Sequence, residues 1–223
     1  MKVAIHQSGP LGSRAASVLL AERRLDLLGL LDQEPSGDPR VVRVEDLSEW
    51  DVLVSDSTTP ATILDRATAA NIPLVLGAEL DRTASIPLFA GAGLIAIARC
   101  LEHESGIDAA LVATTRPGTP LRKGTRVVFP PPVGPLKALQ RRDGLFIAPT
   151  DGDWGGLIIN GDRRSIGVAD HAAFLAGIAL AAAAVVMATL PLPVGAVRVG
   201  DVAGPYLDAA ENAGLEIATF RRP

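Results

Sequence analysis

The opening residues constrain this chain most, because they run from a short apolar strand through a glycine turn into an alanine-rich helix. Residues 3–15 read VAIHQSGPLGSRA. A strand that ends at a Gly-x-x-Gly turn points the unpaired N–H groups of the next helix towards its own carboxyl end, where a phosphate can bind. The turn therefore predicts a nucleotide site at Gly9, Pro10, Leu11 and Gly12.

The composition argues against several classes of partner and location. The chain has 223 residues, enough for a nucleotide domain and a smaller second domain. Its net charge is -4, it has no basic run, and aromatic residues make up 4%, so we expect no nucleic-acid partner. One cysteine and three scattered histidines lack metal-ligand spacing, so we expect no metal. The single Cys100 and the absence of an apolar leader favour a cytoplasmic protein.

An uncharged run over residues 172–197 is long enough to span a bilayer. Alanine and glycine make up much of it, Pro191 and Pro193 interrupt it, and neither end carries an aromatic belt or a basic cluster. We therefore predict no membrane span but a buried helix over about 172–188, whose small residues allow close packing on a sheet or a second subunit.

Strands and helices alternate in the first half of the chain. We predict helices over 13–22 and 61–70 and strands near 25–31, 41–44, 51–56 and 71–77, which is typical of an α/β fold with a Rossmann-like, doubly wound parallel sheet. Beyond residue 80, successive strands predict a smaller α+β domain with a mixed or antiparallel sheet.

The expected domain boundaries follow from this change in the order of strands and helices. Residues 1–80 form the nucleotide-binding domain and residues 81–204 a substrate or dimerisation domain. A helix over 205–213, closed by Gly214, and a strand over 215–220 complete the chain and can return to the first domain.

Asp32 follows the second predicted strand, 20 residues after Gly12. Dinucleotide folds place an acid there to accept hydrogen bonds from the adenosine ribose hydroxyls. Its charge would repel a 2′-phosphate, which favours NAD over NADP. An ordinary solvated aspartate at a strand end is the alternative.

Hydroxyl residues Ser57, Thr58 and Thr59 follow the strand near 51–56, at the same sheet edge as the glycine turn. They are placed to contact the ribose or nicotinamide side of a cofactor. They are equally placed to cap the next helix, which Pro60 would begin.

These features resemble the superfamily of NAD(P)-dependent oxidoreductases that includes dihydrodipicolinate reductase, aspartate dehydrogenase, saccharopine dehydrogenase and glucose-fructose oxidoreductase. The segments that carry the resemblance are 7–12, Asp32, 55–60, 72–78 and 89–94. The resemblance implies a nucleotide domain followed by a sheet domain that often builds a homodimer. Gln7 stands where the family has its first glycine, and Pro10 has no N–H for a phosphate, so we expect weakened or shifted cofactor binding.

Few residues can move a proton in a hydride transfer. His171, with Asp170 beside it, begins the long apolar helix and is our first catalytic candidate, although Asp170 can equally be the N-cap. His6, on the first strand, is either a partly buried core histidine or a residue that lines the phosphate loop.

The loop over 114–123 is the candidate for binding the substrate. Arg116 and Lys123 can hold a substrate carboxylate by paired N–H bonds, and the loop faintly resembles the carboxylate-binding Gly-Thr segment of dihydrodipicolinate reductase. A charged surface hairpin is the plainer interpretation, and the His-His and Lys motif of that enzyme is absent ahead of the loop.

Three functional hypotheses follow. The first is an NAD(P)-dependent oxidoreductase acting on a small anionic carbonyl, imino or amino-acid-like substrate, with NAD preferred. The second is a Rossmann-fold nucleotide-binding sensor or dimeric scaffold without catalysis, because proton-transfer residues are scarce and the glycine motif is incomplete. The third is an adenosylmethionine site, which the strand-rich second half makes less attractive.

Overall fold

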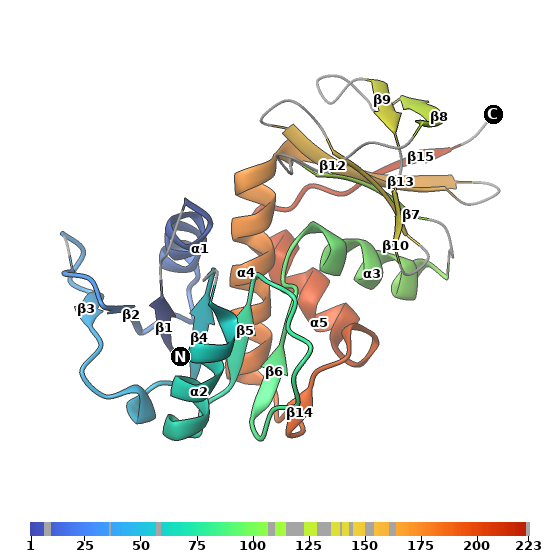
Figure 1. The fold of residues 1–223 in the computed structure, drawn as a ribbon. Helices are drawn as coiled ribbons and strands as arrows, with labels where there is room; N and C mark the ends of the chain where they lie inside the picture. The colour runs from blue at the N-terminus through green and yellow to red at the C-terminus, as the bar shows by residue number, and fades with distance from the viewer. Residues whose placement is uncertain are drawn as a thin grey trace.

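The structure is a computed structural model. It describes residues 1–6, 10–35, 37–56, 59–106, 110–114, 123–128, 135–138, 140–142, 145–149, 154–160 and 164–221. Two sheets lie at opposite ends of the molecule with a layer of helices between them (Figure 1).

The first sheet contains seven parallel strands within the described residues, in the order β14-β6-β5-β4-β1-β2-β3. Their bounds are β1 (Lys2–His6), β2 (Leu27–Leu31), β3 (Val41–Arg43), β4 (Val52–Ser55), β5 (Leu74–Leu76), β6 (Pro87–Phe89) and β14 (Gly195–Ala196). The central strands are apolar runs buried on both faces, as parallel strands usually are. The strand order reverses beside β1, between β2 and β4, which is where open α/β sheets bind ligands.

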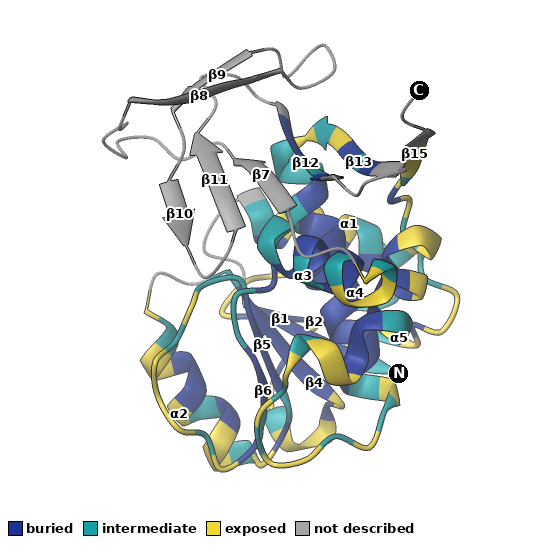
Figure 2. Ribbon diagram, turned by 90° about the vertical axis from the view of Figure 1, so that its right-hand side faces the viewer, coloured by how far each residue is buried: buried dark blue, intermediate teal, exposed yellow. Residues whose placement is uncertain are grey.

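Helices cover both faces of this sheet, and alternate residues of β1 pack into the hydrophobic core on one face or the other. Val3 and Ile5 belong to one core with α1 (Pro10–Ala21) and α4 (Ala172–Thr189). Ala4 belongs to a second core with α2 (Pro60–Ala70) and the Trp50 that follows the short 3-10 helix η1 (Leu47–Glu49). Figure 2 shows the buried and exposed sides of α2. The predicted doubly wound α/β domain is thus confirmed.

The second sheet is mixed. In the described residues its order is β10-β11-β7-β12-β13-β15, with β11 and β7 parallel and the other pairs antiparallel. The strands are β7 (Ala110–Thr114), β10 (Gln140–Arg142), β11 (Leu145–Pro149), β12 (Trp154–Asn160), β13 (Arg164–His171) and β15 (Ala218–Arg221). A separate antiparallel pair joins β8 (Lys123–Val128) to β9 (Pro135–Ala138). Helix α3 (Leu94–Ser105) packs against β7 and β12, and the predicted second domain class is confirmed.

The end of the chain contributes to both sheets, since β14 pairs with β6 and β15 pairs with β13. Helix α5 (Val199–Asn212) lies between these strands in sequence and begins six residues before the predicted start. The prediction began the helix at Pro205 because proline favours the first turn. In the structure Val202, Ala203 and Tyr206 are buried, and this burial offsets the N–H that Pro205 lacks.

Helix α4 is the central element of the helical layer. Within the described residues it is the one helix long and apolar enough to cross a membrane by length and composition, yet 12 of its 18 residues are buried in the fold. It packs against α1, α5 and several strands of the first sheet, which confirms the predicted buried helix. The Tyr206 hydroxyl of α5 donates a hydrogen bond to the Ala179 carbonyl of α4 at 3.1 Å.

The close approach of α4 to α1 depends on Gly177. A Cβ at this position would lie 2.7 Å from the Arg14 Cβ and 3.1 Å from the Arg14 carbonyl carbon. Both distances are too short for ordinary contact, and the Arg14 atoms belong to the helix itself rather than to a flexible side-chain tip. Any side chain at position 177 therefore pushes the two helices apart.

We expect Gly177→Ala to be less stable than Gly200→Ala by about 1–3 kcal/mol, the usual cost of overpacking. Gly200 is the control because it is also inside a helix, while its added Cβ would lie 3.4 Å from the ring tip of the exposed His103 side chain. Gly200→Ala should gain up to about 1 kcal/mol of helix propensity. Chemical denaturation of both variants measures the difference, and equal stabilisation by the two alanines would contradict the tight contact.

Candidate functional site

The carboxyl edge of the first sheet gathers polar groups from separate parts of the chain. His6 ends β1, Asp32 directly follows β2, and Ser55 and Asp56 end and follow β4. The register pairs His6 with Leu31 on one side and with Ser55 on the other. Gly12, in the first turn of α1, lies at the same edge because its N–H bonds to Asp56. This set is called the edge cluster below.

A histidine and a serine form the centre of the edge cluster. His6 Nδ1 lies 3.1 Å from Ser55 Oγ, which is hydrogen-bonding distance across adjacent strands. Ser55 is completely buried, whereas His6 is half-buried. The histidine is therefore held by the sheet and still lies at the edge where a ligand would bind. It is a partly buried histidine, as one interpretation of the sequence has it, and its place at the end of β1 also agrees with the other, a residue beside the phosphate loop.

Asp56 makes the contact that sequence reasoning missed. The Gly12 N–H donates a hydrogen bond to Asp56 Oδ2 at 2.7 Å. Gly12 is the third residue of α1, so this N–H is one of the four that have no partner within the helix. A carboxylate is favourable at that place because the helix start carries partial positive charge. One amide of the predicted phosphate site thus already has an anionic acceptor.

Asp32 lies beside a cation rather than alone. Its backbone is left-handed, with φ +63°, a conformation that aspartate adopts more readily than most residues. Arg66 of α2 places its Nη1 2.7 Å from Asp32 Oδ2. This hydrogen bond, with smaller contributions from the charges of Arg66, His6 and Arg43, holds the pKa of Asp32 below its ordinary value.

A cavity of about 410 Å³ adjoins this pair and is lined by Asp32, Arg43, Arg66 and neighbouring residues. The Asp32 side chain is 59% exposed, so its carboxylate can meet a ligand from the solvent side. The negative charge that was expected to repel a 2′-phosphate is paired with Arg66, and this pairing weakens the sequence-based reason for choosing NAD over NADP.

Several predicted site residues lie outside the described part of the chain: Gly9, Ser57, Thr58, Arg116 and the side chain of Lys123. Their roles remain predictions from sequence. Pro10 begins α1 and brings no N–H, and Leu11 follows it with a half-buried side chain. Thr59 occupies the N-cap position of α2 without a capping hydrogen bond from its side chain, and Pro60 begins the helix as predicted.

Asp170 and His171 lie where β13 joins α4. The N-cap is His171 rather than Asp170, and Asp170 Oδ1 accepts the backbone N–H of His171 at 2.6 Å. The alternative that made Asp170 the cap is thus corrected. The His171 side chain is exposed.

His171 also lies on the same side of the molecule as the edge cluster. Gly177 of α4 contacts Arg14 near the start of α1, while Val185 of α4 and Glu22 beyond the end of α1 line one cavity, so the two helices run in the same direction. Six helical residues separate His171 from Gly177 and span about 9 Å, which puts His171 roughly that far before Arg14 along the helix axis and therefore close to the level at which α1 begins.

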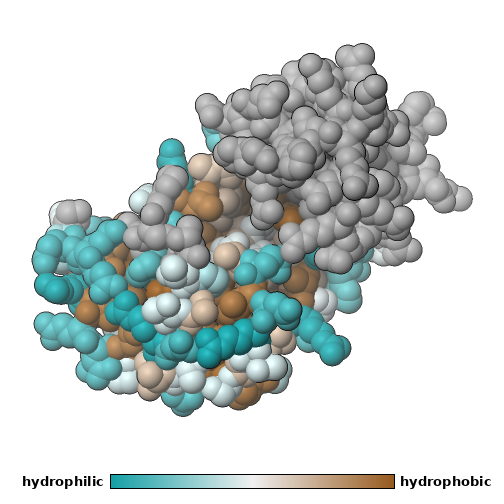
Figure 3. All heavy atoms as spheres, in the orientation of Figure 1, coloured by the Kyte–Doolittle hydropathy of each residue, from teal (hydrophilic) through white to brown (hydrophobic). Residues whose placement is uncertain are grey.

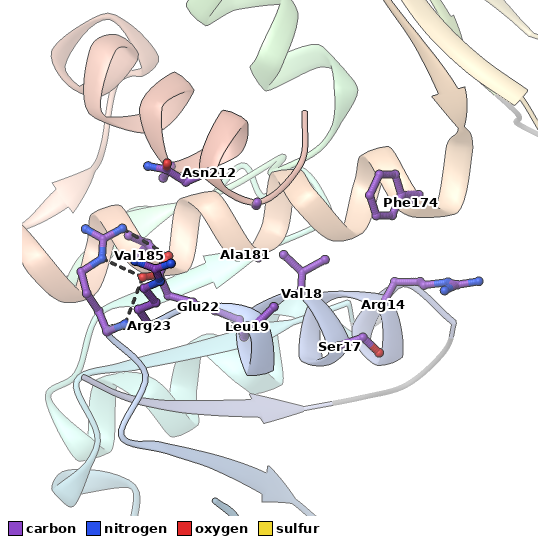
Figure 4. A pocket seen from close by; sticks show the side chains of 14 residues that line it. Arg14, Ser17, Val18, Leu19, Glu22, Arg23, Phe174, Ala181, Val185 and Asn212 are labelled. Carbon is purple, nitrogen blue, oxygen red and sulfur yellow. Dashed lines mark hydrogen bonds and ion pairs between the residues drawn. The ribbon is translucent and has the colours of Figure 1, made fainter. Parts of the chain in front are cut away.

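A second cavity, of about 810 Å³, lies between α1, α4 and α5. Figure 4 shows Arg14 and Phe174 at one end of it and Glu22, Arg23 and Asn212 at the other. None of the edge-cluster residues lines it. The larger of these two cavities is therefore separate from the place where the fold binds ligands.

The surface of the first domain is mixed. Figure 3 shows hydrophilic side chains interspersed with apolar ones over the face seen in Figure 1. Among the residues that the structure describes, Val194 is the one exposed large hydrophobic side chain, and no group of three or more histidine, cysteine, aspartate or glutamate residues could hold a metal ion.

No family model matches this chain, and no curated protein matches its sequence significantly. Its fold is similar to solved structures. A meso-DAP dehydrogenase variant from Clostridium tetani with DAP has a TM-score of 0.56 and 10% identity, over 92% of this chain and 95% of that one. An engineered D-amino acid dehydrogenase bound to NADP+ has a TM-score of 0.52 and 13% identity, covering 90% and 93%.

The C. glutamicum DAP dehydrogenase in complex with DAP has a TM-score of 0.51 and 13% identity, again covering 90% of this chain and 93% of that one. At such low identity these likenesses concern the fold. They confirm the expected architecture, a Rossmann domain followed by a sheet domain.

We expect Arg66→Ala to raise the pKa of Asp32 towards its ordinary value, because the hydrogen bond from Arg66 is the largest influence that lowers it. Carboxyl-carbon NMR titration of Asp32 measures the change. Arg82→Ala is the matched control, since Arg82 pairs with Asp65 of the same helix at 3.0 Å. An Asp32 pKa that moves equally in both variants would argue against the direct pair.

Proposed function

We propose, from the fold shared with amino-acid dehydrogenases, that this protein is an NAD(P)-dependent oxidoreductase acting on a small anionic carbonyl, imino or amino-acid-like substrate. The observation that carries the proposal is the position of Asp32, an ionised acid at the carboxyl end of β2 beside the strand-order reversal. Of the solved structures of this fold described above, two hold DAP and one holds NADP+.

The edge cluster fits one end of a dinucleotide better than the other. At the ribose end, Asp32 is accessible and adjoins the 410 Å³ cavity, so it would accept hydrogen bonds from the adenosine ribose. At the pyrophosphate end, the start of α1 is available only when Asp56 turns away from Gly12. A nicotinamide coenzyme bound here would supply or accept the hydride.

The choice of coenzyme depends on Asp32 and its arginine neighbours. We propose NAD, because a carboxylate that faces the ribose hydroxyls binds them and repels a 2′-phosphate. Arg66 and Arg43 work against that preference, since both carry positive charge beside Asp32 and line the same cavity. Release of Asp32 from Arg66 would therefore accompany tight NAD binding.

The substrate would lie between the edge cluster and the second sheet. There the imidazole of His171 would give or take a proton at the reacting oxygen or nitrogen of the substrate, and Asp170 would hold the backbone of His171 in place. Arg116 and Lys123 would bind the substrate carboxylate, as predicted from their sequence context.

A non-catalytic nucleotide sensor or dimeric scaffold is the second candidate. The Asp56 carboxylate on the Gly12 amide favours the scaffold form, because a helix start that already binds an anion is less ready for a pyrophosphate. Tight, saturable NADH binding without turnover of any small oxo or amino acid would support the sensor over the enzyme.

Titration calorimetry with NADH, NADPH and adenosylmethionine tests the coenzyme assignment. We expect selective binding of a nicotinamide dinucleotide, and Asp32→Ala should weaken NADH binding by about 10-fold or more, because hydrogen bonds to a charged group are lost. Asp65→Ala is the matched control, since Asp65 is an exposed, arginine-paired carboxylate on α2. Unchanged NADH affinity in Asp32→Ala would refute the ribose role.

Turnover measurements test the role of His171. With DAP and D-amino acids as first substrates, His171→Ala should lower kcat by about 100-fold or more, the usual contribution of a general acid or base, and leave NADH affinity unchanged. His103→Ala, an exposed histidine near the end of α3, serves as the control. Full activity in His171→Ala would exclude that residue as the proton donor.

A further inference from the structure

We infer that Asp56 competes with the coenzyme phosphates for the start of α1, so that a dinucleotide binds only when this carboxylate leaves the Gly12 amide. The inference rests on the proposed function and adds a residue that sets affinity and specificity. It assigns to Asp56 the place that a phosphate oxygen would otherwise take.

The geometry at the start of α1 supports this competition. Asp56 Oδ2 accepts the Gly12 N–H at 2.7 Å, the short distance typical of charge-assisted hydrogen bonds. Pro10, the first residue of the helix, has no N–H to offer. Pro10 therefore offers no backbone donor, and Gly12 already donates to Asp56. Among the first three residues of α1, Leu11 is the one whose N–H is not accounted for in this way. A phosphate that needs two adjacent amides must take the one that Asp56 holds.

The backbone around Asp56 is anchored, so the carboxylate must move by rotating its side chain. Ser55, directly before it, is fully buried in β4 and hydrogen-bonded through Oγ to His6. The Gly77 N–H also donates to the Ser55 carbonyl at 2.9 Å. Displacement of the carboxylate then leaves the sheet intact. The free energy needed to break the Gly12–Asp56 hydrogen bond is subtracted from the binding free energy of the ligand.

The charge of a ligand determines whether it must displace the Asp56 carboxylate. A carboxylate and a phosphate are both anions and would occupy the same positive end of the helix, so they repel each other in addition to competing for one donor. Adenosine has no phosphate, and its contacts with Asp32 lie at the end of β2. Asp56 should therefore discriminate between ligands with and without a pyrophosphate.

The same strand provides a matched control. Asp51, just before β4, accepts the Lys2 N–H at 2.7 Å at the opposite, amino edge of the sheet. Asp51 and Asp56 thus make the same type of bond to a backbone amide at the two ends of β4. They differ in the donor: Asp56 accepts from the first turn of helix α1, whereas Asp51 accepts from strand β1.

The experiment titrates the wild-type protein, Asp56→Asn and Asp51→Asn with adenosine, ADP-ribose and NADH. Asp56→Asn should bind ADP-ribose and NADH about 10- to 100-fold more tightly, with adenosine affinity unchanged, because a neutral amide oxygen holds the Gly12 N–H more weakly than a carboxylate does and no longer repels the phosphates. Asp51→Asn should behave like the wild type. Asparagine keeps an oxygen that can accept the Gly12 N–H, so folding should be preserved, and the Tm of each variant checks this. Asp56→Ala repeats the test without any acceptor.

The outcomes separate this inference from the proposed function. If the wild type binds NADH and Asp56→Asn binds it equally or less tightly, the inference is wrong and the coenzyme assignment survives. A gain for adenosine as large as the gain for ADP-ribose would also overturn it. If no variant binds NADH or ADP-ribose, both are wrong. As an independent readout, saturating ADP-ribose should shift the Gly12 amide NMR resonance of the wild type, and an unmoved resonance contradicts displacement.

Discussion

The burial of α4 on several sides is the constraint on which the rest of the structure depends. This helix packs against α1, α5, α3 and strands of both sheets, so it joins two domains that otherwise have separate sheets. Alanine and glycine make this possible because they let neighbouring backbones approach closely, most clearly where Gly177 meets Arg14. The same contact sets the position of α1, and α1 carries the Gly12 amide to the sheet edge. The packing of an apolar helix therefore determines the geometry of a polar site.

Most of the fold could be predicted because its signals are local. Alternating apolar runs and helical segments identify five strands of the first sheet, and Pro60, Gly214 and the small-residue run identify helix boundaries. The strands β6 and β14 were not predicted. β14 has two residues, too short for a periodic pattern, whereas β6 has three, as β3 and β5 do. The early start of α5 was missed for a different reason, since tertiary burial of Tyr206 and its neighbours outweighs the local preference of Pro205.

The candidate site could be predicted only in part. The positions of Gly12 and Asp32 at the carboxyl edge follow from strand order, which the alternation of elements already implies. Their partners could not be predicted, because Asp56 is 44 residues from Gly12 and Arg66 is 34 residues from Asp32. An aspartate after a buried strand and an arginine within a helix are ordinary features of a sequence. Only the folded chain shows that one meets a helix start and the other a strand-end acid.

The course of the chain through the helical layer bears on how the protein folds as it is synthesised. Six strands of the first sheet are complete by residue 89, but α4, which covers one face of that sheet, begins only at residue 172. Synthesis must therefore reach the end of α4 before this face is fully buried. Contacts between segments so far apart form slowly, and the uncovered apolar strands are open to aggregation in the meantime.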